Sequence, residues 1–367
     1  MKIIVDAFGG DNAPLEIIKG AVEAKREYGV DILLVGAEDT IRKVAAENEI
    51  SLDGIAIYHA PDVFTNNDSP SAIRTKAMAN TSLATGFRLL KEGEGDAFLS
   101  AGNSGAIGAG SMFIVKRIKG VKRVAFAPVI PTASDKAMVI DSGINTDVRP
   151  AVLQQFAIMG SVYMNKVIGI ENPRVGLANV GTEEHKGDEL RQETYKLLQK
   201  TPVNFVGNIE GRDVPLDGAD VVVCDGFTGN MIIKTYEGVA LALLGKIKGI
   251  FKKSFKNKLA AMMVLGDMKA FKKEMDLDEF GGTAVLGCSK PVFKRTATRT
   301  PRPSRTRSVS ARTMFPPISS RLSPTRWARS PSLRAGTSDE RSAGSHRLYI
   351  PRSRSAHRGD DPFVLRA

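Results

Sequence analysis

The sequence predicts an α/β protein, in which helices cover a mostly parallel β-sheet. Over the first 294 residues, short runs of β-branched and other apolar residues alternate with longer amphipathic segments, a pattern typical of parallel strands joined by helices. Six of the expected strands run into small polar turns that contain glycine. The chain has 367 residues, of which 42% are hydrophobic and 25% charged, so it is long enough for a sizeable core.

The expected helices and strands follow from local patterns. Pro14 favours the first turn of a helix that runs to about Tyr28, and Pro70 favours a helix that runs towards Lys91. Nine apolar segments are expected to be strands. They are Lys2–Asp6, Asp31–Val35, Ile55–His59, Asp96–Ser100, Val124–Val129, Ala137–Asp141, Arg174–Ala178, Asn204–Gly207 and Ala219–Cys224.

Composition predicts a cytoplasmic protein. The start of the chain reaches Asp6 too early for a secretory signal. No apolar run approaches the roughly 20 residues that a membrane-spanning helix needs. Cys224 and Cys288 are the only cysteines, so we expect no disulfide framework and no metal site.

The net charge of +12 comes from the end of the chain. Of the 52 basic and 40 acidic residues, 16 Arg and 4 acidic residues follow Lys294, so residues 1–294 are neutral. Residues 295–367 contain no lysine and show no sustained periodicity, which predicts a disordered Arg/Ser/Pro-rich tail. We favour an out-of-frame read-through as its origin. The alternative is a natural basic arm that binds nucleic acid.

The six polar turns indicate an anion site. In open parallel sheets such turns share the edge at the carboxyl ends of the strands, where ligands bind. Glycine lets backbone N–H groups approach an anion, although one such turn alone is weak support. The dinucleotide pattern G-x-G-x-x-G is absent from the first turn, which disfavours a nicotinamide cofactor. The turns are residues 7–11, 101–105, 142–145, 179–182, 208–211 and 225–230.

Several long motifs, in order, resemble the phosphate acyltransferase family. They are IIVDAFGGDNAP, SAGNSGA, GVKRVAFAPVIPT, RPAVLQQFAIMG, NVGTEEHKGDEL, GNIEGRD and VVVCDGFTGNMIIKTYEG. The resemblance covers residues 1–294. It implies a Rossmann-like α/β/α sandwich of the isocitrate dehydrogenase type, a homodimer, and transfer of an acyl group from acyl carrier protein (ACP) to inorganic phosphate. The acyl phosphate would feed a membrane glycerol-3-phosphate acyltransferase at the start of phosphatidic acid synthesis.

This reaction needs positioning and charge stabilisation rather than an enzyme nucleophile, because phosphate itself attacks the acyl group. No G-x-S-x-G motif is present, and no cofactor is expected. Lys186 is the expected cation, and Asp225 would orient it or accept a proton. The catalytic residues are thus expected to be Lys186, Asp225 and Asn230, and the phosphate- or substrate-binding residues Gly9, Gly10, Asp11, Gly102, Asn103, Ser104, Gly105, Thr132, Asn179 and Asn208.

Simpler explanations stand beside these assignments. Without the resemblance, Lys186 reads as a solvated loop charge. Gly9, Gly10 and Asp11 are as readily explained by turn geometry as by a ligand. Cys224 follows an apolar run and is expected in the core. His185 receives no catalytic role.

Residues 236–280 are expected to form a helical protrusion. Apolar residues at helical spacing are interleaved with six lysines between positions 246 and 258, a pattern that favours contact with an anionic membrane surface. A helical hairpin at a dimer interface would bury the same side chains. The lysines, with the basic residues of segment 116–123, also offer a surface to the acidic carrier protein.

The resemblance ends at Lys294, where the family would continue with an Ala-His-Gly segment and a final helix. Loss of that helix is expected to expose apolar surface on the sheet. Two other enzyme classes remain open: a phosphotransacetylase-like enzyme that uses acyl-CoA, and a dehydrogenase on the same fold. No nucleic-acid partner is expected for residues 1–294.

Overall fold

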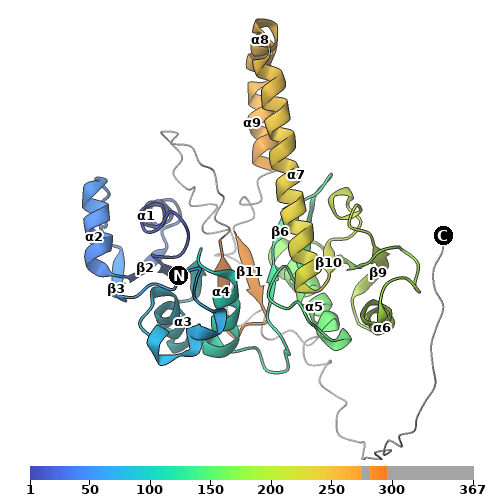
Figure 1. Ribbon diagram of the computed structural model, residues 1–367, viewed down its shortest axis with the longest axis horizontal. Helices are drawn as coiled ribbons and strands as arrows, with labels where there is room; N and C mark the ends of the chain where they lie inside the picture. Colours follow the sequence, from blue (N-terminus) through green and yellow to red (C-terminus); the bar gives the residue numbers. More distant parts are fainter. Residues whose placement is uncertain (275–281, 296–367) are drawn as a thin grey trace, which may run out of the picture. The chain divides into compact units, whose positions relative to one another are not determined.

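The computed structural model describes residues 1–274 and 282–295. These belong to one compact unit, Met1–Gly336, and the second unit, Thr337–Ala367, lies outside the described residues, as does nearly all of the predicted tail. The described chain forms two sheets (Figure 1). The α/β class is confirmed.

The first sheet has seven strands in the order β3-β2-β1-β4-β12-β11-β5. Only β11 runs antiparallel to its neighbours. Side chains alternate between two cores, so that Ile4 packs on one face with Phe87 and Ile3 packs on the other with Ile18. The strands are β1 (Lys2–Asp6), β2 (Asp31–Gly36), β3 (Ala56–His59), β4 (Ala97–Ser100), β5 (Ala125–Ala127), β11 (Thr283–Leu286) and β12 (Val292–Lys294).

The second sheet has five strands in the order β6-β7-β10-β8-β9. They are parallel except for the edge strand β6. Phe156 packs on one face and Ile233 on the other. The strands are β6 (Val129–Pro131), β7 (Lys136–Ile140), β8 (Arg174–Ala178), β9 (Asn204–Ile209) and β10 (Val221–Val223).

Helices cover both sheets. The α-helices are α1 (Leu15–Tyr28), α2 (Glu38–Glu47), α3 (Ser82–Glu92), α4 (Ser104–Gly110), α5 (Pro150–Tyr163), α6 (Glu189–Leu198), α7 (Gly226–Lys252), α8 (Phe255–Met263) and α9 (Leu265–Glu274). Single π-helical turns, η3 (Ser111–Val115) and η4 (Met164–Ile168), extend α4 and α5. The 3₁₀ turns are η1 (Pro70–Arg74), η2 (Lys76–Met78) and η5 (Val214–Leu216).

Two predicted elements differ from the structure. The single helix expected from Pro70 towards Lys91 is wrong, because η1 and η2 precede α3. Thr81 starts α3 anew, since its side chain accepts a hydrogen bond from Ala84 N. The segment expected to be one strand, Val124–Val129, is divided between β5 and β6, which belong to different sheets.

A buried carboxylate joins the two sheets. Asp141, directly after β7, is 0% exposed and its Oδ1 accepts a hydrogen bond from Phe126 N of β5 at 2.9 Å. Its Oδ2 accepts from Ile144 N, Asn145 N and Asn145 Nδ2 at 3.1, 2.7 and 2.8 Å. Burial raises the pKa of Asp141 to about 6 despite these donors. The turn after β7 is therefore fixed to the edge of the first sheet.

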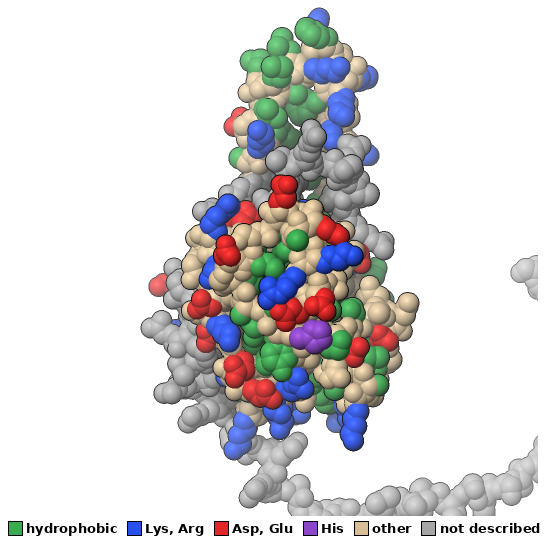
Figure 2. Space-filling view, turned by 90° about the vertical axis from the view of Figure 1, so that its left-hand side faces the viewer, with side chains coloured by type: hydrophobic (Ala, Val, Ile, Leu, Met, Phe, Trp, Pro, Cys, Tyr) green, Lys and Arg blue, Asp and Glu red, His purple; other side chains and the backbone are tan. Residues whose placement is uncertain are grey.

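Helices α7 to α9 extend beyond the sheets (Figure 1). Only Gly226, Gly229 and Ile233, near the start of α7, are buried. The remainder carries exposed apolar side chains beside basic ones (Figure 2). Phe255 and Met263 are each 82% exposed. No helix among the described residues is both long and apolar enough to cross a bilayer.

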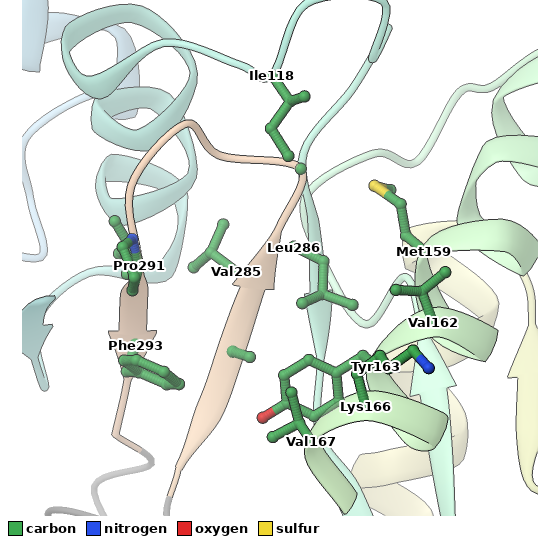
Figure 3. A pocket seen from close by; sticks show the side chains of 13 residues that line it. Ile118, Met159, Val162, Tyr163, Lys166, Val167, Val285, Leu286, Pro291 and Phe293 are labelled. Carbon is green, nitrogen blue, oxygen red and sulfur yellow. The ribbon is translucent and has the colours of Figure 1, made fainter. Parts of the chain in front are cut away.

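A small apolar cavity, partly open to solvent, lies against β11 and β12 (Figure 3). Leu286 and Phe293 line it from the strands, and Met159 and Tyr163 line it from α5. Val285, Leu286 and Val292 of its lining are buried, so this cavity does not show the exposed apolar surface expected where the family resemblance ends.

Substitution Asn145→Ala tests the buried connection. Asn145 Nδ2 donates to both Asp141 Oδ2 and Val124 O at 2.8 Å, and the change leaves both acceptors short of a donor. We expect the free energy of unfolding to fall by about 2–4 kcal/mol, measured by urea unfolding. Asn48→Ala, which removes one exposed bond to Val44 O, should cost less than about 0.5 kcal/mol. Equal losses in both variants would contradict the role given to Asn145.

Candidate active site

All six polar turns lie at the carboxyl ends of parallel strands. Two follow β1 and β4 in the first sheet, and four follow β7, β8, β9 and β10 in the second. The turn after β7 contacts helices from both sheets. A Cβ added at Gly108 of α4 would lie 3.2 Å from Ile144, and one added at Gly143 would lie 3.8 Å from Asn230 Oδ1 of α7. This turn thus connects α4 with the start of α7.

The turns after β1 and β4 are fixed to each other by a buried carboxylate. Asp6 Oδ2 accepts a 2.7 Å hydrogen bond from Ser100 Oγ, which in turn accepts one from Gly102 N at 3.0 Å. Burial raises the pKa of Asp6. A Cβ at Gly9 would come within 2.8 Å of Asp6 Oδ2 and Gly102 N, and Gly10 has a φ of +99°. The turn geometry therefore explains these glycines without a ligand, through the close packing at Gly9, the positive φ of Gly10 and the backbone hydrogen bond of Gly102.

The start of α4 keeps some backbone donors free. Asn103 caps the helix, because its Oδ1 accepts from Ala106 N at 3.0 Å. A Cβ at Gly105 would come within 2.6 Å of Pro70 Cγ, so η1 packs against this turn. The N–H groups of Ser104 and Gly105 donate to no group among the described residues. Asp11 is exposed in the turn after Gly10.

Asp225 is paired with Arg191 rather than with Lys186. Asp225 caps α7 through a 2.9 Å bond from Thr228 N, and its Oδ2 accepts from Arg191 Nη2 at 2.5 Å. Burial raises the pKa of Asp225, but the Thr228 donors and the Arg191 charge outweigh burial, so the pKa lies below its usual value. The expectation that Asp225 orients Lys186 is therefore not supported by its contacts.

Asn179 and Asn208 hold the loop that carries Lys186. Asn179 Nδ2 donates to Lys186 O at 3.0 Å, and Asn208 Nδ2 donates to Glu183 O at 2.8 Å. Asn208 Oδ1 is buried without a partner among the described residues. The partly buried Lys186 side chain makes no ion pair with any residue that the structure describes. The two amides thus fix the backbone of the loop that carries Lys186 at the edge of the second sheet.

Thr132 lies away from the other predicted site residues. It follows β6 and precedes β7, at the amino end of β7, whereas the turns described above lie at carboxyl ends. Its hydroxyl donates to Asp217, next to the start of β10. Asn230 lies near the start of α7, is exposed, and faces Gly143.

Sequence reasoning missed Arg191 and Lys294 at this edge. Arg191 lies three residues after Asp188, the cap of α6, and bonds to it. Its second partner, Asp225, is distant in the sequence and is identified only by the fold. Lys294 ends β12 beside Ser100. The two thiols offer no nucleophile: burial raises the pKa of Cys224 and raises that of Cys288 to about 12.

We expect Arg191→Met to lower the free energy of unfolding by about 3 kcal/mol near neutral pH, because Asp225 would keep a mostly buried charge without its partner. Since the pKa of Asp225 is lower in the folded chain than the ordinary 3.8, the stabilisation is present above pH 3.8 and is lost as the pH falls through the folded-state pKa. The difference between parent and variant should therefore shrink on acidification, as measured by urea unfolding over a pH series.

Arg212→Met is the matched control. Its side chain is 79% exposed and pairs with Glu210, so its loss should cost less than about 0.5 kcal/mol at any pH. A pH-independent loss in Arg191→Met would show that the ion pair is not what stabilises this turn.

Comparisons with known proteins identify the family of this chain. Residues 1–299 match the model of the family described as "Fatty acid synthesis protein". The phosphate acyltransferase of Acetivibrio thermocellus is 50% identical over 296 residues, which cover 80% of this chain and 87% of that protein. That of Bacillus cereus strain B4264 is 43% identical over 328 residues, covering 87% and 98%.

Solved structures support the fold. The phosphotransacetylase of Streptococcus pyogenes has a TM-score of 0.56 at 15% identity and covers 86% of this chain and 91% of its own. The EutD phosphotransacetylase of Staphylococcus aureus has a TM-score of 0.50 at 15% identity, covering 81% and 89%. The turns and the matching sequence lead to one conclusion: the chain belongs to the phosphate acyltransferase family, a family of acyltransferases of fatty acid synthesis.

Proposed function

We propose that this chain transfers a fatty acyl group from acyl-ACP to inorganic phosphate. A phosphate oxygen attacks the thioester carbonyl carbon, the C–S bond breaks, and the products are acyl phosphate and the carrier's free thiol. The observation that carries the proposal is the Lys186 loop, whose backbone carbonyls are bound by two side-chain amides at the carboxyl edge of the second sheet, while the Lys186 ammonium has no ion-pair partner among the described residues. A cation there stabilises the negative charge that develops on phosphate and carbonyl oxygen.

The basic surface of the protrusion favours a carrier protein as donor. Six exposed lysines lie on α7 and α8 and the residues between them, on the side of the sheets where α7 begins. The other basic segment, 116–123, lies by the turn between β11 and β12, because Ile118 N donates to Gly287 O. That turn is at the opposite edge from the site, so we assign carrier docking to the lysines at positions 246, 248, 252, 253, 256 and 258.

An acyl-CoA donor is the second candidate. Phosphotransacetylases are among the solved structures of similar fold, and transfer to phosphate would place the same demands on Lys186. Initial rates with palmitoyl-ACP and palmitoyl-CoA at equal concentration distinguish the donors. They should be measured on the full chain and on a version with a family-type C-terminus after Lys294. If both versions of the chain use palmitoyl-CoA faster than palmitoyl-ACP, acyl-CoA and not the carrier protein is the donor.

Lys186→Ala should lower kcat/KM for acyl-phosphate formation by about 10²–10³, the usual loss when one charge-stabilising group is removed. Acyl phosphate is measured as the hydroxamate formed with hydroxylamine. His185→Ala is the control, because His185 is exposed and adjacent but has no assigned role, and it should retain the parent rate. A parent-like rate in Lys186→Ala would remove the central assignment.

We further propose that the protein is a cytoplasmic homodimer that binds the membrane surface through the protrusion. There it would deliver acyl phosphate to a membrane glycerol-3-phosphate acyltransferase. The apolar side chains of α8 are flanked by lysines, which suits an anionic lipid surface. The exposed apolar residues Val239, Leu241 and Leu243 of α7 are assigned to contact with a second protomer, and the apolar residues of α8 to contact with the membrane.

The double substitution Met262→Asp with Met263→Asp should weaken binding to phosphatidylglycerol vesicles at least about tenfold. These methionine side chains are 71% and 82% exposed, and charged replacements cannot enter the acyl region. Vesicle flotation measures binding, and sedimentation should show an unchanged oligomeric state. Leu216→Asp, which changes an exposed apolar residue before β10, should leave binding as in the parent. Unchanged flotation of the double variant would assign membrane contact elsewhere.

A further inference from the structure

Lys294 is placed at the candidate site by the pairing of β12. It lies opposite Ser100 in the parallel ladder with β4 and opposite Thr283 in the antiparallel ladder with β11. The next residue continues this pairing, since Arg295 N donates to Ser100 O at 2.9 Å. Lys294 therefore stands at the carboxyl end of its strand, beside the turn in which Ser100 holds Gly102.

The Lys294 side chain is directed away from the apolar cavity. Its ammonium lies 5.8 Å from the centroid of the Phe126 ring, and Phe126 N is the donor that anchors Asp141. Phe293 lines the cavity on the other face (Figure 3), because successive side chains of a strand alternate. The ammonium donates no hydrogen bond to any residue within the described ranges.

Within residues 1–274 and 282–295, the charges around this ammonium are not balanced. Burial lowers the pKa of Lys294, Lys234 of α7 lowers it further, and Glu237 opposes them. Glu237 is already bound to Lys234, with a 2.6 Å distance between Nζ and Oε2. Two cations thus share one carboxylate. A partly buried cation without a counter-ion is costly, and a bound anion offsets that cost.

The face of α7 near Lys294 is also the face with a predicted catalytic residue. Asn230, Lys234 and Glu237 stand at positions i, i+4 and i+7, so they share one side of the helix. Asn230 faces Gly143 in the turn after β7. Lys294 is thereby close to the junction of the two sheets, where that turn connects α4 and α7.

We propose that the Lys294 ammonium is a second phosphate-binding cation of this site, acting from the first sheet while Lys186 acts from the second. This inference rests on the proposed function. Inorganic phosphate would supply the negative charge that the ammonium lacks. Pairing with Ser100 holds the strand that carries Lys294, and the Phe126 ring lies beside its ammonium.

The test uses the full chain and the variants Lys294→Met, Lys294→Arg and Lys290→Met. Met keeps an apolar stem against Phe126, and Arg keeps the charge. Lys290 is the control, because it lies in the turn at the other end of β12. Two readouts are used: the KM for phosphate in acyl-phosphate formation, and the rise in Tm produced by inorganic phosphate alone.

Lys294→Met should raise the KM for phosphate about tenfold to hundredfold, as expected for one charge-assisted hydrogen bond, with the KM for the acyl donor unchanged. It should also lose most of the phosphate-dependent rise in Tm. Lys294→Arg should recover part of both effects, and Lys290→Met should match the parent. These results would support the inference.

Other outcomes separate the inference from the proposed function. An active parent whose Lys294→Met variant keeps its phosphate KM and Tm rise would overturn the inference and leave the function in place. A parent that forms no acyl phosphate but shows a Tm rise that depends on Lys294 would overturn the function and support the inference. A parent with no phosphate-dependent Tm rise would overturn the inference.

Discussion

The position of the candidate site depends on the Asp141 carboxylate. A buried charge is costly unless it is well hydrogen-bonded, and here four N–H groups from three residues converge on it. One donor belongs to β5 of the first sheet, and the others belong to the turn after β7 of the second. Because that turn contacts α4 through Ile144 and α7 through Gly143, a single carboxylate sets the relative positions of α4 and the start of α7. The tight approach of Gly229 over Asp141 O, where a Cβ would be 1.9 Å away, adds α7 to the same connection.

A second consequence concerns the polar residues of the turns. Asn, Ser and Thr beside glycine are residue types that bind anions, but most of those found here hold other parts of the backbone. Asn103 caps α4, and Asn179 and Asn208 fix one loop between them. These side chains form their hydrogen bonds within the protein. The groups of the described chain that can still bind an anion are the N–H groups at the start of α4 and the ammonium groups of Lys186 and Lys294. A site organised in this way is rigid before its ligand arrives, which lowers the cost of binding.

The sequence predicts the local parts of this architecture well. The strand Arg174–Ala178 and the helix ending at Tyr28 have the predicted bounds, because periodicity and a proline define them locally. Strands β11 and β12 escaped prediction, since their short segments become strands only by pairing with β4 and β5, which lie far earlier in the chain. The ion pair of Arg191 was not predicted for the same reason, because its partner Asp225 lies 34 residues away in the sequence. Thr132 was predicted from a family-like motif, but the motif does not determine at which edge of the sheet the residue lies, and the structure places it at the amino end of β7.

Strand β12 links stability to the site. Its three residues alternate between two environments, so Phe293 lines the apolar cavity while Lys294 approaches α7 and Phe126. Apolar groups bound in that cavity would cover Phe293, which is partly exposed, and so stabilise a strand that has few residues of its own to hold it. The cation on the opposite face would then be held more firmly in place. If Lys294 binds an anion as proposed, cover for the cavity and binding at the carboxyl edge would be coupled through a strand only three residues long.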